Sequence, residues 1–372
     1  MRLLHVLAET GYSGGEGQLN LILQHFAARG HRNTVILHPG AKFADTAREL
    51  GADVRFLPLR RWWRPDLYPR LRAAIVAADA DILHFACGKA LHIGGLAAIG
   101  RTARVKVTIR RIDYPIRRGL LGGFRYRRLV DHTVAICDAI AERLRAAGVD
   151  AANITRIYDG IDPAPWLPLP RQRAAARQRL AIPADAQLIV CAAVLRPRKG
   201  QRVLIDAFAR LAPAHPRARL FLAGDGSELV ALRQHAQRLG LQDRVALPGA
   251  VRPIHDVLAA ADVFCMPSFH EGLCNACLEA GFAGLPQVVS DAGGNGEIVV
   301  DGQTGAVVRA GDVAALADAI APYLSDDSLA RQHGEAGRER CLRLFTAARL
   351  GPELEELFVR LLADRPRARP NG

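Results

Sequence analysis

The stretch SFHEGLCNACLEAGFAGLPQVVSDAGGNGE, residues 268–297, places two glutamates, Glu271 and Glu279, eight positions apart. Glycine follows the first glutamate, a helix-forming run carries the second, and further glycines close the stretch. Gly272 to Asn275 would form the first helical turn, which offers backbone N–H groups to a phosphate, and Asn275 can cap the helix. Two solvated glutamates are the alternative for this spacing alone. The Ala/Gly run after Glu279 indicates close packing, which favours a site for one polar ligand.

On both sides of this stretch, short apolar runs alternate with longer segments of helical spacing. In the first half the runs expected to be strands are 3–9, 33–39, 52–59, 80–87, 104–110, 132–137 and 154–160. In the second half they are 187–195, 218–226, 244–251, 261–268, 286–294 and 305–311. Strands that are nearly all apolar and separated by helices predict parallel sheets covered on both faces.

The length of the chain predicts two domains. It has 372 residues, half of them apolar, which is too many for one core of ordinary size. Five prolines between Pro163 and Pro183 interrupt the pattern, which then restarts. We therefore expect an N-terminal domain over 1–165, a Pro-rich linker over 166–183, a C-terminal domain over 184–345, and a C-terminal helix with a basic tail over 346–372. Ligands bind such sheets at the carboxyl ends of their strands, so we expect a central cleft there.

The charge of the chain is uneven. Residues 1–162 hold 25 Lys and Arg against 15 Asp and Glu, whereas 163–372 hold 25 against 22. A basic first half suggests an anionic partner there, such as a phosphate, a nucleic acid or an acidic membrane surface. An arginine-rich composition with solvated faces is the alternative.

The cysteines indicate a reducing compartment. All seven stand singly or in apolar runs and are expected to be buried free thiols. Cys274 and Cys277 form a Cys-x-x-Cys pair, which suits redox or metal chemistry, but no second pair stands nearby to complete a zinc site.

No apolar stretch approaches the ~20 residues that span a bilayer. The opening MRLLHVLAETG is expected to be a strand rather than a signal peptide, so we expect a cytoplasmic protein, or one attached peripherally to a membrane.

Two further loops suit anion binding. SGGEGQ, residues 13–18, lies between a strand and a helix, where glycines allow the backbone to approach an anion; a ligand-free tight turn is the alternative. Arg196, Arg198 and Lys199 lie in the loop after the first strand of the second half, where an ammonium and a guanidinium suit a diphosphate. The alternative for this second loop is three solvated charges.

The run 270–308, HEGLCNACLEAGFAGLPQVVSDAGGNGEIVVDGQTGAVV, closely resembles the signature of the family 4 retaining glycosyltransferases. GGEGQLNLILQHFAARGH, residues 14–31, resembles the first loop and helix of that family, and 135–162 resembles the end of its N-terminal domain. The segment 223–251 is similar to its nucleotide-domain core. The resemblance covers nearly the whole chain. It implies an α/β protein of the GT-B fold, with two doubly wound Rossmann-like parallel-sheet domains that face a central cleft.

The resemblance also implies a nucleotide-sugar donor bound by the C-terminal domain and an acceptor bound by the N-terminal domain. By position, Glu279 would bind the ribose, and Lys199 with Arg196 would neutralise the diphosphate. Glu271 would hold hydroxyls of the donor sugar on the reacting face. The other donor-binding positions are Gly14 and Gly15, which would close over the phosphates, Val251 near the base, and the backbone of Gly272, Leu273, Cys274 and Asn275.

Three positions depart from the family pattern. Val194 stands where the family commonly has an arginine, and Cys274 stands where it often has proline. Arg110 takes the place of a histidine that often helps to hold the donor sugar. A permanent cation cannot act as a general base, but it can stabilise a departing diphosphate. Glu271 and Arg110 are therefore the expected catalytic residues, with Glu271 not acting as a nucleophile.

The resemblance implies a retaining hexosyltransferase with no cofactor. We expect it to be metal-independent, because no Asp-x-Asp stands beside these loops. It would transfer a sugar from a UDP- or GDP-sugar to a glycan or lipid-linked acceptor in bacterial cell-envelope polysaccharide or lipopolysaccharide biosynthesis. The alternatives are a nucleotide-sugar epimerase or hydrolase of the same fold and a non-catalytic nucleotide-sugar-binding partner. Release of free sugar without an acceptor would favour the former, and binding without turnover the latter.

Two basic stretches suggest a location for the acceptor. LRRWWRP, residues 59–65, and RRIDYPIRRGLLGGFRYRR, residues 110–128, interleave arginines with aromatic residues. This pattern suits contact with an anionic membrane surface, which would be the inner face of the cytoplasmic membrane. It also suits a phosphorylated glycolipid acceptor. No nucleic acid is expected, because no stacking or groove-reading motif accompanies these stretches. Ordinary solvated surfaces are the alternative.

Overall fold

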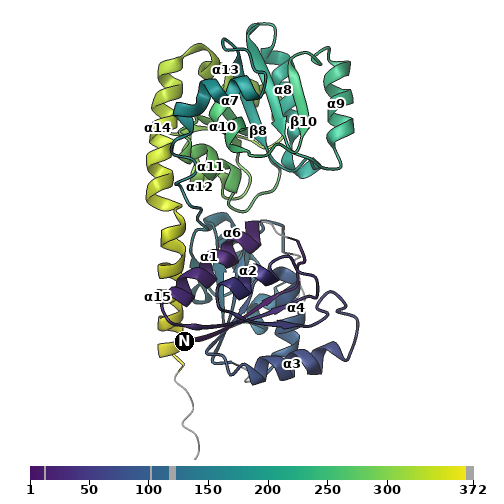
Figure 1. Cartoon of the computed structure of the whole chain (residues 1–372), viewed down its shortest axis with the longest axis vertical. Helices are drawn as coiled ribbons and strands as arrows, with labels where there is room; N and C mark the ends of the chain where they lie inside the picture. The colour runs from purple at the N-terminus through teal and green to yellow at the C-terminus, as the bar shows by residue number, and fades with distance from the viewer. Residues whose placement is uncertain (12–13, 101–102, 117–122, 366–372) are drawn as a thin grey trace, which may run out of the picture. The chain divides into compact units, whose positions relative to one another are not determined.

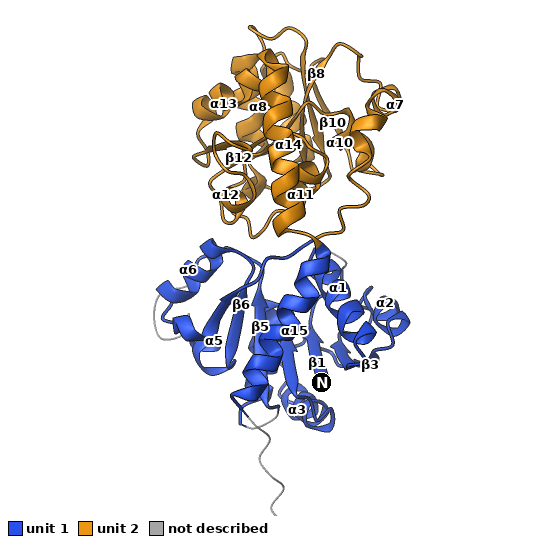
Figure 2. Ribbon diagram, turned by 90° about the vertical axis from the view of Figure 1, so that its left-hand side faces the viewer, with its two compact units in different colours: residues 1–160, 347–372 blue, residues 161–346 orange. Residues whose placement is uncertain are grey.

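The computed structural model describes residues 1–11, 14–100, 103–116 and 123–365. Ser13, six residues of the basic stretch 110–128 and most of the basic tail lie outside the described residues. The chain divides into two compact units (Figure 2). Unit 1 comprises Met1–Gly160 and Ala347–Gly372, and unit 2 comprises Ile161–Thr346. No described helix is long and apolar enough to cross a bilayer.

Unit 1 is built on a parallel sheet of seven strands in the order β3-β2-β1-β4-β5-β6-β7. Its strands are β1 Arg2–Leu7, β2 Arg32–Leu37, β3 Asp53–Phe56, β4 Ile82–Phe85, β5 Val105–Arg110, β6 His132–Ala135 and β7 Ile154–Arg156. Its α-helices are α1 Gly14–Ala28, α2 Ala44–Glu49, α3 Leu67–Ala77, α4 Gly88–Ala97, α5 Phe124–Arg128, α6 Asp138–Ala146 and α15 Ala347–Ala363. A short 3-10 helix, Ala151–Asn153, precedes β7.

Unit 2 repeats the plan with six parallel strands in the order β10-β9-β8-β11-β12-β13. Its strands are β8 Gln187–Ala192, β9 Ala218–Ala223, β10 Val245–Gly249, β11 Val263–Met266, β12 Gln287–Ser290 and β13 Gly305–Val308. Its α-helices are α7 Arg173–Arg179, α8 Gln201–Leu211, α9 Leu229–Arg238, α10 His255–Ala260, α11 Asn275–Phe282, α12 Asn295–Ile298, α13 Val313–Ser325 and α14 Asp327–Leu344. Its 3-10 helices are Leu169–Gln172 and Pro197–Lys199.

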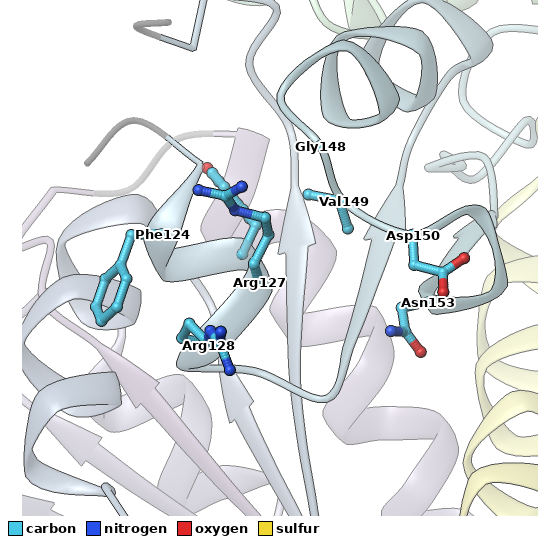
Figure 3. Close-up of a pocket in the computed structure, with 8 residues that line it drawn as sticks. Phe124, Arg127, Arg128, Gly148, Val149, Asp150 and Asn153 are labelled. Atoms are coloured by element: carbon cyan, nitrogen blue, oxygen red, sulfur yellow. The ribbon is translucent and has the colours of Figure 1, made fainter. Parts of the chain in front are cut away.

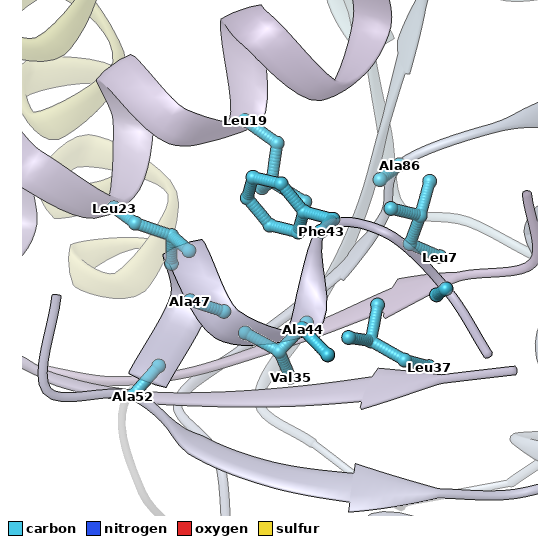
Figure 4. Close-up of a cluster of buried hydrophobic side chains, with 11 residues drawn as sticks. Leu7, Leu19, Leu23, Val35, Leu37, Phe43, Ala44, Ala47, Ala52 and Ala86 are labelled. Atoms are coloured by element: carbon cyan, nitrogen blue, oxygen red, sulfur yellow. The ribbon is translucent and has the colours of Figure 1, made fainter. Parts of the chain in front are cut away.

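Every run expected to be a strand overlaps one of these strands, and all pair in parallel. The reason is visible in the burial of the central strands, whose apolar side chains are covered on both faces. One such core lies between α1, α2 and the sheet of unit 1, where Phe43 packs among Leu19, Leu23, Val35 and Leu37 (Figure 4). The strand order reverses between β1 and β4 in unit 1 and between β8 and β11 in unit 2. Ligands of open α/β sheets bind at such a switch point.

The segment 166–183, expected to be a linker, differs from that expectation. It forms a 3-10 helix and α7, and both belong to unit 2. Arg177 of α7 donates to the carbonyls of Ala260 and Ala186 and to the carboxylate of Asp262. The prolines end the preceding strand pattern as expected, but these bonds anchor the segment to the sheet of unit 2.

The last helix, α15, is part of unit 1 rather than a separate appendage at the end of the chain. Helix α15 packs against α1 in unit 1 (Figure 1). The rings of Phe26 and Phe358 stack there with centroids 5.6 Å apart. The carboxylate of Glu355 is bonded to His25 and His31 at 2.8 Å each. The His31 and His25 bonds, together with the charge of Arg29, lower the pKa of Glu355 to about 2 against the opposing effect of burial. Unit 1 is therefore completed by residues from the far end of the chain.

Candidate functional site

The loops that follow β8 and β11 meet at the switch point of unit 2. The first contains the 3-10 helix Pro197–Lys199, and the second runs from Pro267 to Cys274 and leads into α11. The N–H of Phe269 donates to the carbonyl of Arg198 at 2.7 Å, which joins the two loops. Sequence reasoning placed Lys199 and Glu271 in separate motifs, and the sheet order brings them together.

Lys199 and Glu271 form a buried ion pair. The Lys199 Nζ lies 2.5 Å from Glu271 Oε1, and the two side chains are 11% and 7% exposed. The Ser268 hydroxyl donates to the same oxygen at 2.6 Å, and Ser290 in turn donates to the Ser268 carbonyl at 2.5 Å. Glu271 Oε2 accepts no hydrogen bond from another described residue. One oxygen of this carboxylate is thus fixed, and the other is available to a ligand.

The charge of Lys199 is retained in this buried place. Burial lowers its pKa, but the neighbouring Cys274 and Glu271 raise it, and the net shift is upward. An ammonium has three donors, and Glu271 takes one of them. Lys199 can therefore hold Glu271 and an anion at the same time.

The closing glycines of the stretch 268–297 hold its first glutamate in place. Gly293 has a φ of +54°, and a Cβ at this position would lie 2.0 Å from the carbonyl oxygen of Glu271. The N–H of Gly294 donates to the carbonyl of Gly272 at 2.8 Å. Gly200 likewise allows close backbone contact in the other loop, because a Cβ added there would lie 2.0 Å from the carbonyl oxygen of Pro267. Only glycine permits such close backbone approach in this conformation.

Helix α11 begins three residues later than expected, at Asn275 rather than Gly272. Cys274, with φ −79° and ψ 107°, is the N-cap, and Asn275 is the first helical residue and not a cap. The cause is the extended backbone of Cys274, which delays the helix until the following residue. The backbone N–H groups of Gly272, Leu273, Cys274 and Asn275 donate to no other described residue. This row of free donors at a helix N-terminus is suited to an anion.

Glu279 lies half-buried inside α11, as expected, with no side-chain hydrogen bond or ion pair to a described residue. Burial raises its pKa to about 7. A half-buried carboxyl group without protein partners can accept hydrogen bonds from a ligand. Two other predicted donor residues are less tightly placed: Arg196 is exposed, and Val251 is half-buried after β10, two strands away from β8.

In unit 1, Gly14 and Gly15 form the first turn of α1, which follows β1 at the switch point. Nearby, Gln18 is buried, and its amide donates to the carbonyl of Gly160 at 2.8 Å. Arg110 ends β5, but its guanidinium is engaged within unit 1: Nη1 donates to the Tyr126 hydroxyl and Nη2 to the Tyr114 carbonyl, each at 2.5 Å. Two of the three guanidinium nitrogens of Arg110 are thus bonded within unit 1, and its buried Nε has no hydrogen-bond partner among the described residues.

Two buried polar pairs were missed by sequence reasoning. Arg111 Nε lies 2.9 Å from the Asp159 carboxylate, with side chains 12% and 5% exposed, at the carboxyl ends of β5 and β7. His5 and His84 on neighbouring strands share a contact of 3.0 Å between their Nδ1 atoms. Burial lowers the pKa of His5 to about 4, so it is neutral at pH 7. In the sequence, the one sign of these pairs is that each polar residue stands within or directly after a run expected to be a strand.

A cavity of about 530 Å³ lies elsewhere in unit 1, between α5 and residues 148–153 (Figure 3). Phe124, Arg127, Asp150 and Asn153 are among its lining residues. None of the residues expected to bind the donor lines it. The cavity is therefore distinct from the switch-point loops.

The geometry defines a class of protein: two Rossmann-like units, of which the second places a cation, a carboxylate and free amides at its switch point. The family model Glycosyltransferase Family 4 matches residues 12–165, and the model Glycosyl transferases group 1 matches residues 172–340. The lipopolysaccharide core biosynthesis glycosyltransferase LpsE of Rhizobium meliloti is 32% identical over 255 residues, or 68% of each chain. The chain belongs to glycosyltransferase family 4.

Other similar proteins fit this assignment. A GDP-mannose-dependent alpha-(1-6)-phosphatidylinositol monomannoside mannosyltransferase of Mycolicibacterium smegmatis is 35% identical over 58% of this chain and 59% of its own length. The match thus spans less than two thirds of that relative. The crystal structure of Anabaena Alr3699/HepE in complex with UDP and glucose superposes with a TM-score of 0.84 at 22% identity, covering 97% of this chain and 100% of that one. This similarity confirms the GT-B fold.

Proposed function

We propose that the protein is a metal-independent, retaining glycosyltransferase that uses a nucleotide-sugar donor. The observation that carries the proposal is the row of free N–H groups over residues 272–275 beside the Lys199–Glu271 pair. A diphosphate fits this row and the two unused donors of Lys199. Glu279, one turn further along α11, would accept hydrogen bonds from the ribose diol. Val251 would lie near the base, with Arg196 beside the phosphates.

The reaction would depend on stabilising the leaving group. The bond between the anomeric carbon and the diphosphate oxygen breaks, and negative charge develops on that oxygen. Lys199 and the amide row would stabilise this charge. The acceptor hydroxyl would attack on the same face and give its proton to the leaving phosphate. Glu271 Oε2 would hold a sugar hydroxyl and would not act as a nucleophile, while Oε1 stays bound by Lys199 and Ser268.

Unit 1 would supply the acceptor side. Gly14 and Gly15 would contribute the N-terminus of α1 to the donor phosphates. For Arg110, stabilisation of the leaving diphosphate requires the guanidinium to exchange its bonds to Tyr114 and Tyr126 for the substrate. An exchange of this kind would be visible as a loss of turnover, with donor affinity unchanged, in Arg110→Lys.

The acceptor would be a glycan or lipid-linked saccharide of the bacterial cell envelope, reached at the inner face of the cytoplasmic membrane. The names of the relatives support this class of acceptor, since one is a phosphatidylinositol monomannoside mannosyltransferase and another acts in lipopolysaccharide core biosynthesis. Trp62 and Trp63 support the membrane contact, because they are 56% and 66% exposed between arginines. Aromatic and arginine side chains together suit an anionic interface. Co-sedimentation with phosphatidylglycerol vesicles, but not phosphatidylcholine vesicles, would be the expected behaviour.

The experiment that tests the proposal is thermal stabilisation by UDP-, GDP-, ADP- and dTDP-sugars in the presence of EDTA. The UDP of the HepE structure and the GDP-mannose of the mycobacterial relative make these two bases the first to try. A ligand at about 100 times its Kd stabilises by ~2.7 kcal/mol, which is a measurable shift. A shift for one donor that survives EDTA supports the proposal. No shift for any donor would overturn it, and free sugar released without acceptor would indicate a hydrolase.

A further inference from the structure

One buried side chain ties the beginning of α1 to a distant segment of unit 1. Gln18 is the fifth residue of α1 and is 3% exposed. Its Nε2 donates to the carbonyl of Gly160 at 2.8 Å, and its Oε1 accepts from the N–H of Gly160 at 3.4 Å. Both polar groups of this side chain are therefore bonded to the backbone of one residue, 142 positions away.

The segment that contains Gly160 is itself fixed by a buried ion pair. Asp159 is 3% exposed, and its two carboxylate oxygens accept from Nε of Arg111 at 3.2 and 2.9 Å. Arg111 directly follows β5, and Asp159 and Gly160 lie beyond the end of β7. These contacts connect the carboxyl end of β5 to α1. We refer to Arg111, Asp159, Gly160 and Gln18 as the α1 network.

The part of α1 that this network holds is accessible and weakly helical by its own sequence. Three of the first four residues of the helix are glycine, which is among the poorest helix formers. Gly14 is exposed and Gly15 is half-buried, and their N–H groups donate to no other described residue. Contacts elsewhere are therefore needed to keep these amides in one orientation.

The apolar contacts of α1 act further along the helix. Leu19 and Leu23 pack in the core of unit 1, and Phe26 stacks on Phe358. All three residues come after Gln18 in the chain, so they fix the body of the helix. The bonds to Gly160 act one turn from the helix start, where the glycines stand.

We propose that Gln18 and the Arg111–Asp159 pair are positioning residues for donor binding. They would keep the amides of Gly14 and Gly15 directed at the diphosphate without touching it. This role rests on the proposed function, in which those two glycines contribute the N-terminus of α1 to the donor phosphates. Donors that are held in place before binding need not be ordered by the ligand, so the α1 network contributes affinity for the diphosphate.

The variant Gln18→Met tests this role, because it keeps a side chain of similar length and removes both bonds to Gly160. Affinity for UDP or GDP, whichever the protein binds, should fall about tenfold, since the helix start must then be ordered on binding. Affinity for uridine or guanosine, which lack phosphates, should stay unchanged. Titration calorimetry measures the diphosphates, and ligand-observed NMR measures the nucleosides. Gln24→Met, the same change at an exposed position of α1, is the matched control and should bind as the wild type does.

Arg111 provides a second comparison, which also serves if Gln18→Met fails to fold. Arg111→Met should weaken diphosphate binding selectively, and Arg111→Lys should restore most of the affinity, because an ammonium can still pair with Asp159. Unchanged diphosphate affinity in Gln18→Met and Arg111→Met would overturn the proposal. An equal loss for diphosphates and nucleosides would also overturn it, because that result indicates general damage to the fold.

Hydrogen exchange tests the α1 network without any ligand. In Gln18→Met we expect faster exchange in peptides that contain residues 14–21 and no change in peptides of unit 2. Unchanged exchange over residues 14–21 would show that the network does not hold the helix start. If the wild-type protein binds neither UDP nor GDP, the proposed function fails and the donor role of the network fails with it. The exchange measurement still decides, in that case, whether the network fixes the start of α1.

Discussion

Lys199 and Glu271 show how one pair of side chains can define a binding site. Each would be costly to bury alone, because an ion without a partner loses its hydration. Their separation of 2.5 Å, with Ser268 as a third partner, offsets this cost and still leaves donors on Lys199 and one oxygen on Glu271. Removing one partner is therefore expected to cost more than removing both.

The first prediction concerns this pair. Lys199→Met should destabilise unit 2 by about 3–5 kcal/mol, because it leaves a buried carboxylate without its cation. The double variant Lys199→Met/Glu271→Gln should recover most of that loss. Both variants should lose donor binding, since Lys199 is expected to hold the diphosphate. Chemical denaturation measures the stabilities, and equal destabilisation of the two variants would show that the pair is not coupled.

The second prediction concerns Glu279 and pH. Its pKa is raised from 4.5 to about 7 in the folded protein, so between these values the folded state binds more protons than the unfolded state. The stability of the unliganded protein should therefore fall as pH rises from 4.5 to 7, by up to about 3 kcal/mol.

Glu279→Gln is the matched control for this titration. It should remove the fall in stability, and it should also weaken donor binding by about 1–3 kcal/mol through lost hydrogen bonds to the ribose. Thermal unfolding across pH measures the first effect, and titration calorimetry measures the second. Unchanged donor affinity would place the ribose elsewhere.

At the scale of elements, the site is formed where loops from different strands touch through their backbones. The helix α11 alone would present free amides, but it would lack the Lys199–Glu271 pair. The loop before it is held by Gly293 and Gly294, and the loop after β8 by Gly200. Gly293 and Gly294 thus support the glutamate that precedes the helix.

The third prediction tests this support. Gly293→Ala should destabilise the protein by several kcal/mol and depress turnover, since its Cβ would press against the Glu271 carbonyl in a conformation that L residues avoid. Gly296→Ala in α12 is the control, because nothing lies within 4 Å of its added Cβ. It should be neutral or stabilising by up to ~1 kcal/mol. Similar losses in both variants would contradict the close-approach argument.

At the scale of the whole molecule, unit 1 draws on distant sequence. Unit 2 begins with the proline-rich segment, and unit 1 ends with α15, which packs on α1 through Phe26 and Phe358. Unit 2 is one continuous segment, whereas unit 1 combines both ends of the chain. The last helix should therefore control the stability of the first domain.

The fourth prediction follows from that connection. Phe358→Ala should cost about 3–5 kcal/mol, because the side chain is fully buried against Phe26. Hydrogen exchange should accelerate in unit 1 peptides and not in unit 2 peptides. Val359→Ala, next along the helix and 55% exposed, should change exchange little. Faster exchange confined to unit 2 after Phe358→Ala would contradict the assignment of α15.

The local sequence pattern was sufficient to predict the secondary-structure elements and the family. The alternation of apolar runs predicted both parallel sheets, since buried parallel strands must be apolar along their whole length. The motifs around Gly14, Lys199, Glu271 and Glu279 predicted the loops in which candidate residues lie, because ligands of such sheets bind after strands. These features depend on neighbouring residues, which the sequence presents directly.

Only the tertiary structure decided which side chains meet. Lys199 and Glu271 are 72 positions apart and Arg111 and Asp159 are 48 apart, and no local pattern encodes either pairing. Tyr126 engages Arg110, and Asp262 anchors the expected linker, through contacts that likewise depend on how strands order in a sheet. The sequence by itself determined the elements and the chemistry available at their ends. The partners were decided by the packing of the sheets, because the energy of a buried charge depends on what lies within a few ångströms of it.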